Sequence, residues 1–132
     1  MMERSRDLVF YRMARANESI EDDRILAREG RWNACVNRLY YACFYPVSAL
    51  LAGDGLSSSK HAGVRSLFNS QYVKPGKLPK DLARIYNDLF ERRQEGDYID
   101  FVNFEESQVL PWIAKAEKLI EHISDHIDKQ IK

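Results

Sequence analysis

Apolar and polar residues alternate along the chain with a period near 3.6 residues, and no stretch of strand length shows convincing every-second-residue alternation. That period is typical of amphipathic α-helices. Turn-forming residues divide the pattern into five segments, which begin near residues 5, 31, 60, 79 and 103. We therefore predict an all-α protein with five helices that forms one domain over residues 1–132.

The first predicted helix, over about residues 5–29, has an apolar stripe that Asp23 interrupts. Asp23 belongs to an acidic cluster with Glu18, Glu21 and Asp22, and a solvated helix face explains such a cluster better than a metal site does. The apolar positions of the stripe are Val9, Met13, Ala16, Ile20 and Ala27.

The second predicted helix, over about residues 31–51, has a wide apolar face and is predicted to form the centre of the bundle. Pro46 lies inside it, where its ring and its missing N–H predict a kink rather than a break. Cys35 and Cys43 are about two helical turns apart, too far for a disulfide within one helix, so both are predicted to be core residues. The Gly-Asp-Gly segment at 53–55 is predicted to end the helix.

Capping and breaking residues predict where the later helices begin and end. The serines at 57–59 offer N-caps for a short third helix, Pro79 suits the first turn of the fourth, and Gly96 is predicted to end the fourth. Asn103 with Glu106 predicts a start for the last helix that is similar to a capping box. The apolar stripe of this last helix consists of Leu110, Ile113, Ala116, Ile120, Ile123 and Ile127.

Charge and composition exclude several classes of protein. Lysine plus arginine equals aspartate plus glutamate at 20 residues each, so any binding of RNA must rest on a local basic patch rather than on a general basic excess. No apolar run approaches the length of a membrane span, and no signal-like segment follows the N-terminus, so we expect a cytoplasmic protein with no membrane contact. Zinc-type Cys/His spacing, Glu-x-x-His and a glycine-rich phosphate loop are missing from the sequence, and we predict no metal and no cofactor.

Three features of the sequence point to chemistry, and the first is Arg93. It falls on the apolar stripe of the fourth predicted helix with Leu82, Ile85 and Leu89. Burial of a guanidinium without a partner is costly, so Arg93 needs an anion. That anion is Asp97 one turn later, a carboxylate of another chain, or a phosphate. A structural Arg93–Asp97 pair that holds the turn is the alternative to a functional role.

The second and third features lie on the second and third predicted helices. Arg38 shares a helix face with Tyr41 and small residues, which suits either a stacking and hydroxyl-bearing surface or a helix-packing face with one satisfied arginine. Lys60 and His61 stand at the start of the short helix, where free N–H groups favour anions. There His61 either assists proton transfer or binding of a phosphate, or is a partly buried packing residue.

Together these features resemble one family. The motifs are Arg38-x-Tyr40-Tyr41-Ala42, then Lys60-His61 followed by Gly63-Val64 and Phe68, then Arg93-x-x-Gly96-Asp97-Tyr98. They are similar to those of the small HEPN-domain proteins and, more closely, to those of the branch called uncharacterised protein family 0332. The resemblance covers residues 32–98 by motif and the rest of the chain by helix layout.

This resemblance implies an up-and-down bundle of four to five helices that forms a homodimer and works near RNA or nucleotides. Many members are encoded beside a minimal nucleotidyltransferase and act as toxin–antitoxin pairs, and others belong to phage-defence systems. The active members are metal-independent RNases with an arginine followed four to six residues later by a histidine. The residues that the resemblance makes candidates for catalysis are Arg93, His61 and Tyr98, and those for binding of nucleotide, phosphate or partner are Arg38, Tyr41, Lys60 and Asp97.

The chain departs from the RNase motif of the family. The only histidines are His61, His122 and His126, and none of them follows an arginine at the required spacing. Tyr98 stands at the fifth position after Arg93, and a phenol with a pKa near 10 is a poor base at neutral pH. His61 supplies the missing imidazole only if folding or dimerisation brings it near Arg93. Pro46 is a second departure, and it can alter the dimer seam.

Three hypotheses follow from the sequence. The first is a binding module, the helical partner of a minimal nucleotidyltransferase in a toxin–antitoxin or defence pair. The second is a metal-independent endoribonuclease with a divergent site. The third is a structural bundle in which arginines only satisfy buried carboxylates, and it predicts that loss of Arg93 destabilises the fold.

Overall fold

The computed structural model describes residues 3–131, which form five α-helices, one π-helical turn and no strand. This confirms the predicted all-α fold class. The α-helices are α1 (Glu3–Arg28), α2 (Trp32–Gly53), α3 (His61–Phe68), α4 (Lys80–Tyr98) and α5 (Glu106–Ile131), and the π-helical turn η1 (Asn69–Val73) directly follows α3. In these residues no helix combines the length and the apolar character that a membrane crossing requires.

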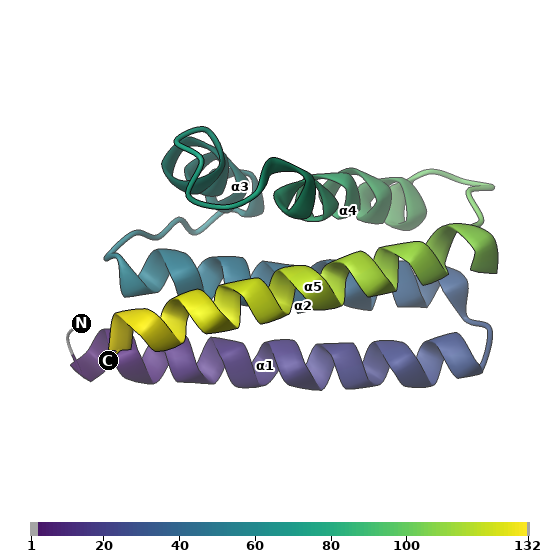
Figure 1. Cartoon of the computed structure of the whole chain (residues 1–132). Helices are drawn as coiled ribbons and strands as arrows, with labels where there is room; N and C mark the ends of the chain where they lie inside the picture. Colours follow the sequence, from purple (N-terminus) through teal and green to yellow (C-terminus); the bar gives the residue numbers. More distant parts are fainter. Residues whose placement is uncertain (1–2, 132) are drawn as a thin grey trace.

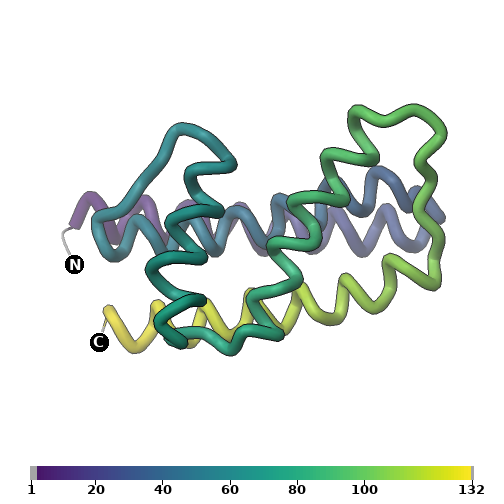
Figure 2. The backbone as a smooth tube through the Cα atoms, turned by 90° about the horizontal axis from the view of Figure 1, so that it is seen from above, coloured from purple at the N-terminus to yellow at the C-terminus, as the bar shows by residue number. Residues whose placement is uncertain are grey.

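Four long helices run alternately in opposite directions, as an up-and-down bundle requires (Figure 1). α1 lies on one side of α2 and α5, while α3 and α4 form a layer on the other side, with α4 running obliquely over α2 (Figure 2). α2 contacts α1, α3, α4 and α5, so the prediction that it is the central helix is confirmed. It continues through Pro46 without a break.

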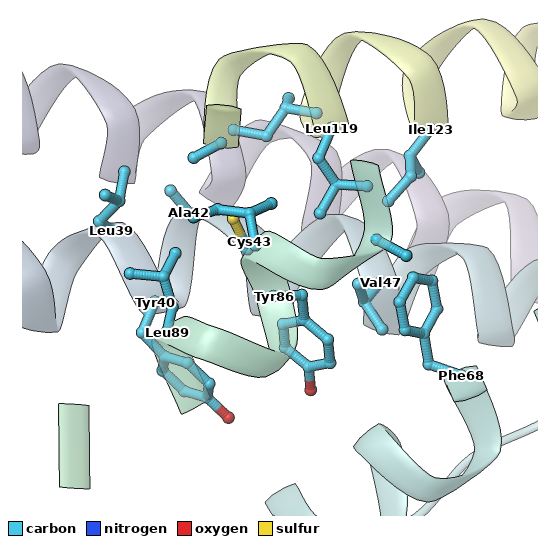
Figure 3. Close-up of a cluster of buried hydrophobic side chains, with 14 of the residues drawn as sticks. Leu39, Tyr40, Ala42, Cys43, Val47, Phe68, Tyr86, Leu89, Leu119 and Ile123 are labelled. Carbon is cyan, nitrogen blue, oxygen red and sulfur yellow. The ribbon is translucent and has the colours of Figure 1, made fainter. Parts of the chain in front are cut away.

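The core forms where α2 meets α5 and α4. Figure 3 shows Cys43 and Val47 of α2 against Leu119 and Ile123 of α5, and all four side chains are fully buried. Cys43 and Cys35 are free thiols in this core. Because the period of 3.6 residues gathers the apolar residues of α2 on a wide face, this one helix packs against several neighbours at once.

Two predictions for the first and last helices are wrong. Asp23 is fully buried and does not belong to the solvated acidic face that the sequence predicted. Leu110 was placed on the apolar stripe of the last helix but is 46% exposed, whereas its neighbour Val109 is fully buried. Leu110 is one residue, and therefore about 100°, away from the buried Val109, so a stripe fixes the buried face only approximately. Asp23 lies on the apolar stripe itself, and the error was to group it with its acidic neighbours.

Gly96 does not end α4, which continues to Tyr98. A Cβ at Gly96 would lie 2.9 Å from the ring of Phe104, in the segment that leads into α5. The glycine therefore permits close packing of an aromatic ring against α4 and is not a helix stop. This packing holds the chain after α4 close to the helix.

The predicted caps of α3 and α5 are also wrong in detail. Lys60 occupies the N-cap position of α3 without a capping side chain, and the hydroxyl of Ser58 accepts a hydrogen bond from the Lys60 N–H at 3.3 Å. α5 begins at Glu106 rather than at Asn103. The side chain of Gln108 accepts a hydrogen bond from the N–H of Glu105 at 2.9 Å, which is half of a capping box shifted by two residues.

Candidate functional site

Arg93 and His61 contact the same tyrosine. The hydroxyl of Tyr40 lies 2.9 Å from Nδ1 of His61, and the guanidinium carbon of Arg93 lies 4.6 Å from the centre of the Tyr40 ring. Three helices supply the cluster: α2 gives Tyr40, the first residue of α3 is His61, and α4 gives Arg93. One chain thus brings an imidazole close to Arg93, which the sequence made the condition for an RNase-type site.

The position of Tyr40 follows from the wide apolar face of α2. Its ring is fully buried, 6.0 Å from the ring of Tyr86 on α4, with the two planes nearly parallel. In Figure 3 both hydroxyls point away from Leu119 and Ile123, the α5 side of the core. The packing of apolar rings therefore places a polar group at the boundary between the core and the layer formed by α3 and α4.

Aromatic rings hold the imidazole of His61. Its ring stacks on Phe44 at 4.4 Å between centres and meets Tyr41 edge-on at 5.9 Å. Burial lowers the pKa of His61 below its ordinary value, and the positive charge of Arg93 lowers it further. The imidazole is therefore predominantly neutral at pH 7 and able to accept a proton.

Tyr40 remains a neutral phenol at physiological pH. Burial raises its pKa to about 12, although the charge of Arg93 acts in the opposite direction. The hydroxyl can donate to Nδ1 of His61, which leaves the proton of the imidazole on Nε2, or accept from Nδ1–H, which leaves Nε2 as an acceptor. The same contact is thus compatible with an acid or a base at Nε2 of His61.

The charge of Arg93 has only a loose partner. The Arg93 side chain is 10% exposed, and its Nη1 lies 3.6 Å from a carboxylate oxygen of Asp97, beyond hydrogen-bond distance. The Nε atom of Arg93 is buried and has no hydrogen-bond partner among residues 3–131. Asp97 in turn accepts a hydrogen bond from the side chain of Asn37 at 3.2 Å. Donors of Arg93 thus remain for an anion such as a phosphate.

Tyr41 lies between two arginines. The guanidinium carbon of Arg38 is 4.9 Å from the centre of its ring, and that of Arg93 is 6.0 Å away. On the same side of α2, Ala42 and Ala49 are fully buried, so this face also serves helix packing, as the alternative interpretation of the sequence held. Arg38 and Tyr41 extend the cationic and aromatic character of the site toward the surface.

Two predicted site residues stand apart from the cluster. Lys60 is exposed at the N-cap of α3, next to His61, and lies at the rim. Tyr98, the last residue of α4, is 77% exposed, so its ring is not packed into the cluster. Arg93, His61, Tyr41, Arg38 and Asp97 are therefore the predicted residues that the fold brings together.

Sequence reasoning missed the residues that join the cluster. Tyr40 was part of the family motif but was not among the candidate site residues, and neither Phe44 nor Asn37 was given a role in the site. A signal was present for Tyr40, because a buried tyrosine hydroxyl generally requires a hydrogen-bond partner. No feature of the sequence pairs Asn37 with Asp97, because that contact depends on how α4 crosses α2.

Residues 3–131 contain no group of three side chains that is suited to hold a metal ion. His122 and His126, four residues apart on α5, are half-buried. The cluster around Tyr40 contains a guanidinium, an imidazole and a phenol.

Comparison with known proteins identifies the family. The model of the HEPN domain matches residues 10–126. A protein of Thermotoga maritima named "UPF0332 protein" is 45% identical over 127 residues, which cover 96% of this chain and 96% of the relative. A protein of Methanocaldococcus jannaschii named "Putative toxin" is 31% identical over 109 residues, 82% of this chain and 80% of the relative. This chain therefore belongs to the HEPN domain family, in the branch of uncharacterised protein family 0332.

Proposed function

We propose that this protein is the toxin-type component of a toxin–antitoxin or defence pair and that it cleaves RNA without a metal ion. The observation that supports this most is the placement of the His61 imidazole and the Arg93 guanidinium against one buried tyrosine, Tyr40. Two relatives of Methanocaldococcus jannaschii whose names contain the word toxin favour the same role.

The proposed reaction is attack of an RNA 2′-hydroxyl on the adjacent phosphate. Nε2 of His61 accepts the proton of the 2′-hydroxyl, the new O–P bond closes a 2′,3′-cyclic phosphate, and the 5′-oxygen leaves with a proton from water. Arg93 binds the non-bridging oxygens, where negative charge grows in the transition state. Tyr40 keeps the imidazole oriented through its hydrogen bond to Nδ1.

The test is cleavage of single-stranded RNA by the purified protein in the presence of EDTA. Arg93→Ala and His61→Ala should each lower the rate at least about a hundredfold, with unchanged circular dichroism. Lys118→Ala, which removes an exposed charge on α5, is the matched control and should cleave like the wild type. Wild-type protein that leaves RNA intact would refute the nuclease proposal.

A second proposal is that the end of α4 and the segment after it contact a minimal nucleotidyltransferase. Three apolar or aromatic side chains are exposed there, Tyr98 by 77%, Ile99 by 56% and Phe101 fully. Neighbouring exposed apolar residues are typical of a protein interface. Phe101→Ser should abolish co-purification with a nucleotidyltransferase encoded beside this protein, whereas Phe10→Ser on α1, which is 50% exposed, should not. Co-purification that survives Phe101→Ser would exclude this surface.

The homodimer implied by the family is also part of this proposal. Its test is sedimentation of the purified chain, with a mass near twice 15.4 kDa as the expected result. Sedimentation at the mass of one chain would exclude the homodimer and leave the cluster around Tyr40, which one chain supplies by itself, unaffected.

A further inference from the structure

A polar groove lies beside the candidate site, between α3 with η1 on one side and α4 on the other. Two of its lining residues are charged, Arg65 and Lys74, and both are positive. The other lining side chains that carry hydrogen-bonding groups are Ser66, Asn69, Ser70 and Asn87. A lining of two cations with hydroxyls and amides suits an anionic ligand that also offers polar edges.

Two asparagine amides form a reciprocal pair in this groove. Nδ2 of Asn69 donates to Oδ1 of Asn87 at 2.9 Å, and Nδ2 of Asn87 donates to Oδ1 of Asn69 at 3.0 Å. Each amide has two N–H donors and two acceptor lone pairs, so each keeps one donor and one acceptor beyond the pair. The pair uses the parallel donor and acceptor of each amide, and the groups that remain point apart, so a nucleobase edge binds an asparagine here in the usual bidentate way when it takes the place of the other asparagine.

The backbone of the groove is unusual at the same place. Asn69 begins the π-helical turn η1, whose Lys74 N–H donates to the Asn69 carbonyl at 2.8 Å. Single π-helical turns are costly and occur frequently at functional sites. Here the turn carries Asn69 at its start and leads directly to Lys74, so it supplies both an amide and a cation to one groove.

Arg65 connects the groove with the candidate site. Its guanidinium carbon lies 3.9 Å from the centre of the Phe90 ring, and that ring meets Tyr40 edge-on at 6.0 Å. Nη1 of Arg65 binds Glu91 at 2.8 Å, while the side chain is still 30% exposed. Because a guanidinium has five N–H donors, Arg65 keeps donors for a phosphate while it is held in place by Phe90 and Glu91.

We infer that this groove binds one nucleotide of the single-stranded RNA whose neighbouring phosphate lies at Arg93, with the base edge at Asn69 and Asn87 and the phosphate on Arg65 and Lys74. Single-stranded RNA exposes the base edges that such amides bind. The inference rests on the proposed action on RNA, and it adds a determinant of base preference next to the reacting groups.

Binding of labelled homopolymeric RNA octamers, followed by fluorescence anisotropy, tests the groove. The octamers carry 2′-O-methyl groups, which block cleavage. We expect wild-type protein to bind the four homopolymers with affinities that differ about tenfold. Asn69→Ala and Asn87→Ala should remove this difference, whereas a merely structural role of the amide pair would lower all four affinities together or none.

A charge variant covers the case in which the asparagine variants fail to fold. Lys74 is exposed, so Lys74→Glu should fold and should weaken binding of every octamer at least about tenfold. Lys118→Glu on α5 is its control, with binding close to that of the wild type. Equal binding of the four octamers by the wild type, or unchanged binding by Lys74→Glu, would overturn the inference.

The outcome for the groove is separable from the outcome for catalysis. Base-dependent binding without cleavage in EDTA would retain the groove and remove the nuclease proposal. Cleavage in EDTA with binding that is unaffected by the asparagine and Lys74 variants would retain the site at Arg93 and remove the groove.

Discussion

Two charged residues are buried on apolar helix stripes of this protein, and their surroundings differ. Arg93 lies over the ring of Tyr40, has a carboxylate oxygen of Asp97 at 3.6 Å and is 10% exposed. Asp23 on α1 is fully buried, and neither of its carboxylate oxygens has a hydrogen-bond partner among residues 3–131. The surroundings of Arg93 therefore contain groups that favour its positive charge. The surroundings of Asp23 contain no group that forms a hydrogen bond with its carboxylate.

The difference shows what burial does to a charge. Burial raises the pKa of Asp23 to about 7, against a smaller opposing effect of its contact with Cys35, so a large fraction of it is protonated at neutral pH. An arginine remains protonated in proteins, and Arg93 has aromatic faces and a nearby carboxylate to accommodate its charge. The region around Arg93 is thus suited to bind an anion, whereas the region around Asp23 favours the neutral form of a buried carboxyl.

The largest expected effect is a loss of RNA cleavage on replacement of Arg93, with little change in the stability of the fold. Arg93→Met should lower RNA cleavage by about 10²- to 10³-fold, because it removes the donors for the phosphate. The free energy of unfolding should change by less than about 1 kcal/mol, since the Arg93–Asp97 contact is long and the Asp97 side chain is partly exposed to solvent. Cleavage rates and denaturant unfolding of the same samples provide the two measurements.

The opposite result would favour the structural interpretation of Arg93. If Arg93→Met lost several kcal/mol of stability, the arginine would serve to hold the turn after α4 and the contrast with Asp23 would disappear. Asp23→Asn is the matched control, because it removes the charge of the other buried residue. It should leave RNA cleavage unchanged.

The second effect is a pH-dependent stabilisation by Asp23→Asn. Because the pKa of Asp23 is about 7 in the folded protein and 3.8 as the ordinary value, the folded state binds the proton more tightly. The wild type therefore loses stability as the pH rises from about 4 to about 7, and the loss is complete above that range. At pH 8 the variant should be more stable by up to about 4 kcal/mol, and at pH 4 the two should be similar.

Denaturant unfolding of both proteins at pH 4, 6 and 8 measures this effect. Asp22→Asn removes a charge from the neighbouring, half-buried position of α1 and should not reproduce the gain at pH 8. A wild type that becomes more stable between pH 4 and pH 8 relative to Asp23→Asn would show that a partner stabilises the Asp23 carboxylate in solution.

The helices could be predicted from the sequence because apolar periodicity is a local property. It located five helices and the central position of α2. It placed Asp23 on an apolar stripe but did not predict its burial, and it put Leu110 in place of Val109 on the buried face, since neighbouring helices decide which residues of a stripe are covered. The role of Gly96 could not be predicted either, because the Phe104 ring that occupies the position of a Cβ at Gly96 belongs to a later segment of the chain.

The candidate site could be predicted in part. Arg93 could be identified as a candidate because it lies on an apolar stripe. His61 could be identified because it begins a helix and follows a lysine. Their meeting at Tyr40 depends on the path of α3 and α4 over α2, which no local pattern encodes. The exposure of Tyr98 was also unpredictable, since it depends on how far α4 continues past Gly96.

A third, smaller effect is expected for Tyr40→Phe. This change keeps the ring under Arg93 and removes only the hydroxyl that binds His61 at 2.9 Å. Loss of one hydrogen bond corresponds to about 1 kcal/mol, so RNA cleavage should fall about five- to tenfold, well below the effect at Arg93. Tyr45→Phe removes a tyrosine hydroxyl on the same helix that binds Arg15 instead, and it should leave cleavage unchanged. Equal rates for Tyr40→Phe and the wild type would exclude an orienting role of Tyr40.

The smallest effect is expected for Asp97→Asn. The Asp97 side chain is 32% exposed and its oxygen is 3.6 Å from Nη1 of Arg93, so solvent screens the pair and its contribution to stability should be below about 1 kcal/mol. A double-mutant cycle of Asp97→Asn with Arg93→Met, followed by denaturant unfolding, isolates the coupling between the two side chains. A coupling of several kcal/mol would mean that Arg93 already has its anion within the chain. A coupling near zero would leave the charge of Arg93 available to a phosphate. This availability is the property that distinguishes Arg93 from Asp23, whose carboxyl is fully buried.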